Sequence, residues 1–404
     1  MNVVITPSRL AGTVVAPPSK SDAHRLLICA ALADTPTRVA LDAANRDIEA
    51  TAACLRALGA EIEIENSNWT VTPIAQVPRH AVMDCGESGS TLRFLMPVAA
   101  ALGVRARFEG HGRLPQRPNA PLVEALCAHG ASVTSDLLPT EVSGPVSGGL
   151  WTLPGNVSSQ YVTGLLLALP LLGESSRIAL TTRLESAAYV DMTLRAMARF
   201  GALAVPTEDG WRLPAGQRYR SPGSVRVEGD WSAAAFWLAA DAMGGDIRVD
   251  GLDGDSPQGD RAVTRLLGQR EIDVSNVPDL VPALAVAAAK QPGTTVITGA
   301  ARLRLKESDR LQSVADLLAA LGHEVQIAPD GLVIRGGAPA PAQADIRTVD
   351  GANDHRIVMA AAVAAAFADR PVRITGAEAV EKSYPDFFRD FTRLGGLIHV
   401  EHAG

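Results

Sequence analysis

One pattern recurs six times along this 404-residue chain: an amphipathic helix, a turn, and a short β-like run. The copies are "TAACLRALGAEIEI", "PLVEALCAHGASVT", "VDMTLRAMARFGALAV", "AVTRLLGQREIDV", "LQSVADLLAALGHEV" and "DFFRDFTRLGGLIHV". In five copies the helix pattern ends at a glycine, before the β-like run. We expect these glycines to adopt the left-handed conformation of a helix cap: Gly59, Gly130, Gly201, Gly322 and Gly395. Arg270 takes that place in the fourth copy. Self-similarity of this kind predicts a fold assembled from one repeated unit.

A second helix pattern, apolar on almost every side, alternates with the first. Its copies are "HRLLICAALA", "STLRFLMPVAAALG", "YVTGLLLALPLLG", "WSAAAFWLAADAMGG", "LVPALAVAAAK" and "RIVMAAAVAAAFAD". Helices that are apolar all round are buried. A chain of this length also exceeds what one hydrophobic core usually holds. The sequence therefore predicts an α/β protein with two lobes of three units each, and the Pro/Gly-containing stretch at 218–230 lies near the expected boundary.

Composition excludes several classes of protein. Hydrophobic residues make up 47% of the chain, aromatic residues only 4%, and the formal net charge is −7, which is typical of a soluble α/β protein. An acidic balance argues against nucleic acid as a partner. The stretch "MNVVITPSRLAG" does not have the pattern of a signal peptide, and the longest apolar run, residues 357–368, is too short to span a bilayer. We expect a cytoplasmic protein with no membrane partner.

The four cysteines form no C-x-x-C pair, and no histidine stands near them at the spacing of a zinc site; they are Cys29, Cys54, Cys85 and Cys127. We therefore expect free thiols and no metal.

Polar residues precede every buried helix, in "SKSDAHR", "GESGSTLR", "SSQ", "EGDWS", "VPD" and "NDHR". A helix N-terminus exposes unpaired N–H groups and a partial positive charge, so it can bind an anion. The alternative is that some of these residues are only N-caps, as Ser and Asp commonly are: Ser88, Ser158 and Asp230. Caps do not require the cations Lys20, Arg25 and Arg356, which oppose the helix dipole. These cations indicate a ligand with several negative charges.

Three further stretches add charged residues, "GRLPQRP", "RLRLKESDRL" and "EKSYPD". Taken alone, "KESDRL" is equally well explained as a helix start with local ion pairs on a solvated face. Its significance comes from the recurrence of such clusters along the chain.

Together these stretches resemble the enolpyruvyl transferases, and most closely the 5-enolpyruvylshikimate-3-phosphate synthase family. The matching motifs are "PPSKSDAHR", "GESGSTLRF", "LPQRP", "SSQYVTGLLLA", "YVDMT", "VPDLVPALA", "LKESDRL", "DHRIVMA" and "KSYPDF", which occur in order over nearly the whole chain. The resemblance implies a two-lobed, inverted α/β barrel-like fold in which each lobe has three β-α-β-α-β-β units and the buried helices point their N-termini at a cleft. It also implies that the first strand returns to the second lobe, so that residues 14–225 form one lobe and residues 1–13 with 226–404 the other.

The resemblance further implies the reaction. Family members join the 5-hydroxyl of shikimate 3-phosphate to C2 of phosphoenolpyruvate through a tetrahedral adduct, which then eliminates phosphate. No metal or organic cofactor takes part. Both substrates are polyanions, which agrees with cations and hydroxyls at the helix starts, and we expect a monomer.

The roles of individual residues are carried over from the family motifs. Shikimate 3-phosphate is expected to contact Lys20, Ser21, Arg25, Ser158, Ser159, Gln160, Ser186, Asp279 and Lys306. Phosphoenolpyruvate is expected to contact Lys20, Gly89, Arg117, Gln160, Arg310, Arg356 and Lys382. The resemblance makes Asp279 the base for the 5-hydroxyl and Glu307 the acid for the methylene carbon, with Lys20 close enough to share that work. At Gly89, a side chain would enter the space of a small ligand.

Three other functions remain as alternatives. The sister family that acts on UDP-N-acetylglucosamine usually carries a reactive cysteine in the loop matching "GHGRLPQRPNAP", whereas Cys127 lies beyond that loop in an apolar helix pattern and is expected in the core. RNA 3′-phosphate cyclases have a related unit, but they should show a nucleotidylated histidine and a less acidic surface. A non-catalytic anion-binding scaffold would gain nothing from Asp279 and Glu307, because like charges repel, so this pair favours an enzyme.

Overall fold

The computed structural model describes residues 1–341 and 344–401, and the chain divides into two compact units. Unit 1 comprises residues 1–17 and 229–404, and unit 2 comprises residues 18–228. Each unit has its own hydrophobic core. The first strand of the chain therefore belongs to the same unit as the last.

Unit 2 contains three four-stranded sheets of the same construction, in which a parallel pair of strands is extended by an antiparallel hairpin. The sheet orders are β14-β3-β5-β4, β6-β7-β9-β8 and β10-β11-β13-β12. The strands are β3 (Thr37–Ala40), β4 (Glu61–Glu65), β5 (Asn68–Thr72), β6 (His80–Asp84), β7 (Arg105–Glu109), β8 (Ser132–Val133), β9 (Thr140–Ser143), β10 (Gly149–Leu153), β11 (Ser176–Leu180), β12 (Val205–Thr207), β13 (Gly210–Leu213) and β14 (Ser224–Arg226). Because β14 pairs with β3, the end of the unit completes its first repeat.

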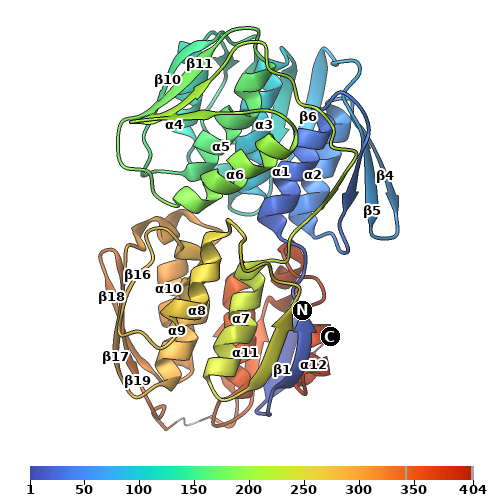
Figure 1. The fold of residues 1–404 in the computed structure, drawn as a ribbon. Coiled ribbons are helices and arrows are strands. Elements are labelled where there is room, and N and C mark those ends of the chain that lie inside the picture. The colour runs from blue at the N-terminus through green and yellow to red at the C-terminus, as the bar shows by residue number, and fades with distance from the viewer. Residues whose placement is uncertain (342–343, 402–404) are drawn as a thin grey trace. The chain divides into compact units, whose positions relative to one another are not determined.

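The helices of unit 2 alternate between buried and amphipathic, as the two sequence patterns predict. The buried helices are α1 (Lys20–Ala31), α3 (Gly89–Ala101) and α5 (Ser159–Ala168). The amphipathic helices are α2 (Arg46–Ala57), α4 (Ala120–Ala128) and α6 (Ala187–Arg199), and the short 3₁₀ helices are η1 (Leu114–Gln116) and η2 (Leu169–Leu171). Figure 1 shows β10–β11 and β4–β5 on opposite sides of the unit, with helices between them.

Among the described residues of unit 1, two of three sheets again consist of a parallel pair extended by two antiparallel strands, in the orders β16-β17-β19-β18 and β20-β21-β1-β22, although β1 and β22 are far apart in sequence and form no hairpin. The third sheet is only the parallel pair β2-β15. The strands are β1 (Asn2–Thr6), β2 (Ala11–Val15), β15 (Asp246–Asp250), β16 (Glu271–Asp273), β17 (Gly293–Thr298), β18 (Glu324–Ala328), β19 (Gly331–Gly336), β20 (Arg347–Asp350), β21 (Val372–Thr375) and β22 (Leu397–Glu401). Strand β1 lies between β21 and β22.

The helices of unit 1 follow the same alternation. The buried helices are α7 (Trp231–Ala242), α9 (Val281–Lys290) and α11 (His355–Ala366). The others are α8 (Val263–Leu266), α10 (Arg310–Ala320) and α12 (Phe387–Arg393), with the 3₁₀ helices η3 (Gly259–Ala262), η4 (Pro278–Leu280), η5 (Ala301–Leu305) and η6 (Ala377–Lys382). The predicted α/β fold of repeated β-α-β-α-β-β units is confirmed, and the repeat around β2-β15 is shortened.

Five of the six expected helix caps are confirmed. The cap glycines have positive φ angles, of 102° at Gly59, 103° at Gly130, 73° at Gly201, 88° at Gly322 and 95° at Gly395. The expectation for Arg270 is wrong, because α8 is a single turn and the chain leaves it early, so that Gly268, with φ of 84°, takes the left-handed conformation. Arg270 instead donates to the Pro292 carbonyl at 2.7 Å.

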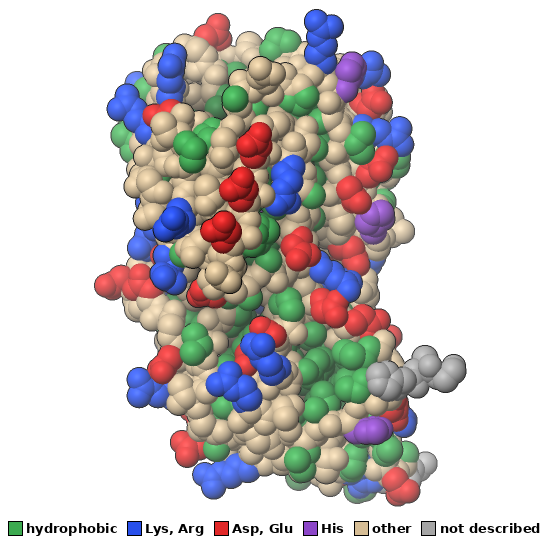
Figure 2. Space-filling model, turned by 90° about the vertical axis from the view of Figure 1, so that its right-hand side faces the viewer, with side chains coloured by type: hydrophobic (Ala, Val, Ile, Leu, Met, Phe, Trp, Pro, Cys, Tyr) green, Lys and Arg blue, Asp and Glu red, His purple; other side chains and the backbone are tan. Residues whose placement is uncertain are grey.

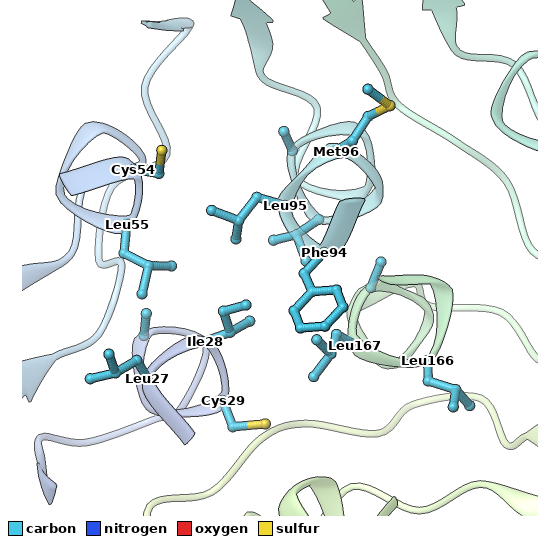
Figure 3. Packing of buried hydrophobic residues seen from close by; sticks show 14 of the residues in the cluster. Leu27, Ile28, Cys29, Cys54, Leu55, Phe94, Leu95, Met96, Leu166 and Leu167 are labelled. Atoms are coloured by element: carbon cyan, nitrogen blue, oxygen red, sulfur yellow. The ribbon is translucent and has the colours of Figure 1, made fainter. Parts of the chain in front are cut away.

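The core of unit 2 lies where its helices meet. Figure 3 shows Ile28 of α1, Phe94 of α3 and Leu167 of α5 pointing into a common centre, with Leu55 of α2 beside them. All four side chains are fully or almost fully buried. Burial of this apolar area is the main favourable contribution to folding.

The expectation that Cys127 belongs to the core is wrong, since its side chain is exposed. The buried positions of α4 are Leu122, Ala125 and Leu126, and the 3.6-residue period turns Cys127 toward solvent. All four cysteines carry free thiols.

Charged side chains of both signs are interspersed over the face seen in Figure 2, together with smaller hydrophobic areas. None of the helices formed by the described residues has the length and apolarity that a bilayer crossing needs.

Close packing of α3 against α5 depends on Gly164. A Cβ atom there would lie 2.2 Å from the Arg93 carbonyl oxygen, although alanine is otherwise the better helix former. We expect Gly164→Ala to lower the free energy of unfolding by about 1–3 kcal/mol, as overpacking does. Urea denaturation checks this against Gly173→Ala, where a Cβ would meet no heavy atom within 4 Å. Equal midpoints for the two variants would contradict the packing argument.

Candidate functional site

In unit 2, the helices α1, α2, α3 and α5 all begin at the same end. Each starts with a side-chain cap, provided by Ser19, Asn45, Ser88 and Ser158. Side-chain bonds join these starts: Lys20 to Asp47 between α1 and α2, and Gln160 to Ser90 between α5 and α3. The exposed N–H groups of several helices therefore converge, and this end of the unit favours anions.

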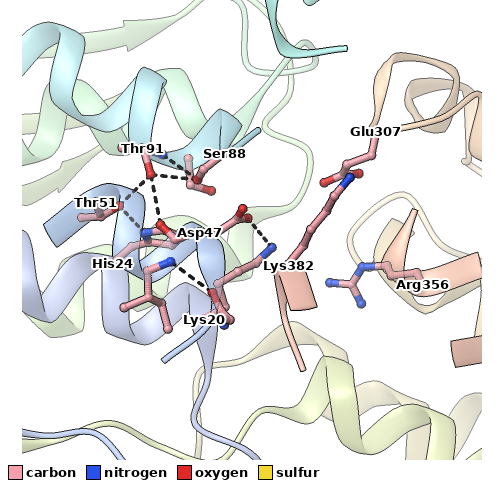
Figure 4. Close-up of polar contacts among 12 residues, drawn as sticks. Lys20, His24, Asp47, Thr51, Ser88, Thr91, Glu307, Arg356 and Lys382 are labelled. Atoms are coloured by element: carbon pink, nitrogen blue, oxygen red, sulfur yellow. Dashed lines mark hydrogen bonds and ion pairs between the residues drawn. The ribbon is translucent and has the colours of Figure 1, made fainter. Parts of the chain in front are cut away.

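Lys20 is the first residue of α1, and its ammonium forms an ion pair of 2.8 Å with the Asp47 carboxylate (Figure 4). The exposed fractions of the two side chains are only 14% and 11%. A cation so little exposed needs a nearby opposite charge. Sequence reasoning missed Asp47, although an acidic residue in the first turn of a helix is a recognisable signal.

Gly89 begins α3 directly beside the guanidinium of Arg117. A Cβ at Gly89 would lie 2.6 Å from Arg117 Nη1, so a side chain there would displace the guanidinium as well as entering the space of a ligand, as the sequence suggested. Arg117 is 8% exposed, and its Nε is buried with no hydrogen-bond partner among the residues that the structure describes. A buried guanidinium with an unsatisfied donor is suited to bind a carboxylate or phosphate.

Gln160 is held in one orientation by two neighbours. Arg93 Nη1 donates to its Oε1 at 2.6 Å, and its Nε2 donates to Ser90 Oγ at 3.0 Å. Arg93 also donates to Asn119 Oδ1 at 2.9 Å, and lies over the Tyr161 ring. Sequence reasoning assigned no role to Arg93, because a buried arginine inside an apolar helix pattern does not reveal its partner.

The other predicted residues of unit 2 lie at or near the starts of α1, α5 and α6. Arg25 is buried one turn into α1 and donates to the Ser21 carbonyl at 2.6 Å and to Thr193 Oγ1 at 2.8 Å. Burial lowers the pKa of Arg25 to about 10, which leaves it charged at neutral pH. The predicted serines lie in the same region: Ser158 and Ser159 at the start of α5, and Ser186 immediately before α6.

In unit 1, the candidate residues surround one guanidinium. Arg310, the first residue of α10, is 1% exposed and contacts three carboxylates: Asp354 at 2.9 Å, Asp279 at 2.9 Å and Glu307 at 2.5 Å. Burial alone would lower the pKa of Arg310, but the three carboxylates outweigh it and raise the pKa. Sequence reasoning missed Asp354, the N-cap of α11.

Asp279 lies in η4 among three cations. Its Oδ1 is 2.9 Å from Arg310 Nη1 and 3.4 Å from Lys306 Nζ, and its Oδ2 is 3.2 Å from Arg356 Nη2. Lys382, the last residue of η6, donates to the Asn353 carbonyl at 2.7 Å. The six predicted residues of unit 1 thus come from η4, η6, the segment between η5 and α10, and the starts of α10 and α11.

A further carboxyl group, that of Asp260 in η3, interacts electrostatically with Asp279 and Arg356. It is 3% exposed and accepts a hydrogen bond from Ser232 of α7. Burial and the Asp279 charge raise the pKa of Asp260 to about 6. Sequence reasoning did not find this residue. Among residues 1–341 and 344–401, no group of three or more His, Cys, Asp or Glu side chains has the arrangement of a metal site.

The family model described as EPSP synthase (3-phosphoshikimate 1-carboxyvinyltransferase) matches residues 4–271 and 264–391. The chain is 38% identical to 3-phosphoshikimate 1-carboxyvinyltransferase of Methanocorpusculum labreanum, covering 99% of this chain and 100% of the relative. It is 39% identical to the protein of the same name from Clostridium kluyveri, covering 100% and 99%. A solved structure of EPSP synthase from Acinetobacter baumannii has a TM-score of 0.82 at 26% identity, covering 99% of this chain and 100% of that one.

A buried carboxyl group at the start of α1 makes the stability of the protein depend on pH. Burial raises the pKa of Asp22 to about 6. The carboxylate of Asp22 also accepts a hydrogen bond of 3.1 Å from the Glu228 N–H, which opposes this rise in pKa. A carboxyl group whose pKa is raised in the folded state binds its proton more tightly in the folded than in the unfolded chain. Its contribution to the free energy of unfolding is therefore most favourable below pH 4 and is lost as the pH rises to 6.

We expect Asp22→Asn, which cannot ionise, to gain stability relative to the wild type as pH rises from 4 to 7, by up to about 3 kcal/mol. Urea titrations at several pH values measure the difference. A difference that does not change with pH would show that Asp22 titrates normally in the folded protein.

Proposed function

Because the chain belongs to the EPSP synthase (3-phosphoshikimate 1-carboxyvinyltransferase) family, it is an enolpyruvyl transferase of the shikimate pathway, and we propose how its residues divide the reaction. It transfers the enolpyruvyl group of phosphoenolpyruvate to the 5-hydroxyl of shikimate 3-phosphate and releases phosphate. This is a step in aromatic amino acid biosynthesis. The observation that best supports the catalytic assignment is that Asp279 and Glu307 both bind the Arg310 guanidinium.

In the proposed division, the residues at the helix starts of unit 2 hold most of shikimate 3-phosphate. They are Lys20, Ser21, Arg25, Ser158, Ser159, Gln160 and Ser186, to which unit 1 adds Asp279 and Lys306. Phosphoenolpyruvate is bound by Lys20, Gly89, Arg117 and Gln160 of unit 2 and by Arg310, Arg356 and Lys382 of unit 1. The buried, unsatisfied Nε of Arg117 supports this assignment, since a carboxylate or phosphate would satisfy it.

The proposed chemistry needs one base and one acid. Asp279 removes the proton from the 5-hydroxyl, whose oxygen bonds to C2 of phosphoenolpyruvate, while Glu307 delivers a proton to C3, and Lys20 shares in this proton transfer. The tetrahedral adduct then returns a proton from C3 to Glu307 as the bond from C2 to the phosphate oxygen breaks and phosphate leaves. The exposed fraction of Glu307 is 18% and that of Asp279 is 13%, so both carboxylates are accessible to a bound substrate.

A coupled assay of phosphate release tests the function directly. With phosphoenolpyruvate present, we expect turnover with shikimate 3-phosphate and none with UDP-N-acetylglucosamine, because the acceptor sites of the two families must recognise different groups. Turnover with the nucleotide sugar alone would assign the chain to the sister activity. Turnover with neither acceptor would favour a non-catalytic anion-binding protein.

Replacing the two carboxylates separates catalysis from binding. Asp279→Asn removes negative charge among Lys306, Arg310 and Arg356, so shikimate 3-phosphate should bind as well as before or more tightly. The catalytic rate should fall by roughly a hundredfold or more, as general-base loss usually does. Glu307→Gln should also lose rate and keep affinity.

Calorimetry and turnover on the same preparations measure both quantities. Glu324→Gln is a matched control, because it removes a carboxylate of unit 1 from an exposed ion pair with Arg335. It should change neither affinity nor rate. If both site variants lose affinity and rate together, Asp279 and Glu307 maintain the structure and are not the acid and base.

We further propose that the protein is a monomer and is located in the cytoplasm. A biosynthetic family with two small, charged substrates supports the location. Cell fractionation tests it, and analytical ultracentrifugation with and without both substrates tests the monomer; a sedimentation coefficient that rises with protein concentration would argue for an oligomer.

A further inference from the structure

Four buried side chains form a continuous hydrogen-bonded chain beneath the helix starts of unit 2 (Figure 4). His24 Nδ1 of α1 lies 2.7 Å from Thr51 Oγ1 of α2, which lies 2.6 Å from Thr91 Oγ1 of α3. Thr91 Oγ1 is in turn 2.8 Å from Ser88 Oγ. Each of the four residues has an exposed fraction of 1% or less. Three helices are thus joined by polar contacts within an otherwise apolar core.

The donor and acceptor of each hydrogen bond in this series follow from the protonation of the His24 ring. Burial, reinforced by the charges of Lys20 and Arg25, keeps the pKa of His24 well below its usual range, so the ring is neutral and has one N–H. Its Nε2 is buried and has no hydrogen-bond partner within residues 1–341 and 344–401. Buried N–H groups without an acceptor are rarer than buried acceptors without a donor. The proton therefore belongs on Nδ1, and the donors run from His24 through Thr51 and Thr91 to Ser88.

The chain ends at residues that matter for the proposed phosphoenolpyruvate site. Ser88 is the N-cap of α3 and immediately precedes Gly89, which lies against Arg117. Ser88 Oγ also accepts a hydrogen bond of 3.2 Å from the Thr91 N–H. Both the backbone and the side chain of Thr91 therefore donate hydrogen bonds to the N-cap side chain of Ser88. In addition, Thr91 Oγ1 lies 3.4 Å from the carbonyl oxygen of Asp47, whose carboxylate holds Lys20.

We propose that Thr51 and Thr91 are positioning residues, which together with His24 fix the start of α3 so that Gly89 and Arg117 are correctly placed for phosphoenolpyruvate. This inference rests on the proposed function. None of the four hydrogen-bonded side chains, those of His24, Thr51, Thr91 and Ser88, needs to touch the substrate. A residue that acts through another in this way changes the geometry of binding, and small displacements at a site can have large kinetic effects.

Thr51→Val and Thr91→Val test the proposal, because valine keeps the shape of threonine but cannot continue the chain. We expect the KM for phosphoenolpyruvate to rise by about tenfold, with less than about a twofold change in the KM for shikimate 3-phosphate. Thr51→Ser, which restores a hydroxyl, should recover most of the loss. If Thr51→Val does not fold, Thr91→Val and Thr91→Ser test the next link.

Thr37→Val is the matched control. Thr37 is also a fully buried threonine of unit 2, and its Oγ1 lies 2.7 Å from Ser221 Oγ, but it belongs to β3 and not to this chain. It should lower the thermal midpoint about as much as Thr51→Val and leave both KM values unchanged. If Thr51→Val and Thr37→Val have the same kinetic effect, the chain has only a structural role and the proposal is overturned.

Nitrogen-15 NMR of the histidine rings tests the direction of the chain independently of activity. In the wild type, His24 should be the neutral Nδ1–H tautomer and remain so down to pH 5.5, whereas an Nε2–H tautomer would overturn the proposed direction. Absence of phosphate release by the wild type would instead refute the proposed function and leave this spectroscopic test in force.

Discussion

The burial of six helices that are apolar on nearly every side is the constraint on which the rest of this structure depends. Such helices expose their unpaired polar groups at their ends, where four N–H groups lack partners within the helix. In unit 2, Ser19, Ser88 and Ser158 cap these starts, and cations stand beside them. The core therefore dictates where chemistry can occur: anions are bound where the helices begin, and hydrophobic side chains fill the space behind.

Charge balance accounts for the unusual residues at these ends. Lys20 and Arg310 are largely buried cations, and burying a charge is costly unless it is paired. The carboxylate of Asp47 neutralises Lys20. Arg310 is surrounded by three carboxylates, those of Asp354, Asp279 and Glu307. Asp354, fully buried and capping α11, makes two hydrogen bonds to Arg310, whereas Asp279 and Glu307 make one each and are partly exposed. The carboxylates most able to exchange partners are thus the two with proposed catalytic roles.

The repeats could be predicted because each depends on local rules. Apolar periodicity defines the buried helices, and the cap glycines are needed where an L-side chain would be strained, as at Gly59 and Gly322. Prediction failed where the local rule was ambiguous. Arg270 was aligned to a cap, but the helix before it ends after one turn and Gly268 takes the cap position. Cys127 lies in an apolar stretch, but only one face of α4 is buried, and neighbouring elements decide which face that is.

The α/β class, the six repeats, the family and the residue types gathered at the helix starts all follow from local patterns in the amino-acid sequence. The pairing of these residues follows from the folded arrangement alone. Asp47, Arg93 and Asp354 contact Lys20, Gln160 and Arg310 across 27, 67 and 44 positions of sequence, and local patterns carry no information about such contacts. The same holds for the contact of Gly89 with Arg117 and for the hydrogen bonds that join His24, Thr51 and Thr91. Periodicity indicates that a segment is a helix with an apolar face, whereas a hydrogen bond between helices depends on their final packing, which the whole core determines together.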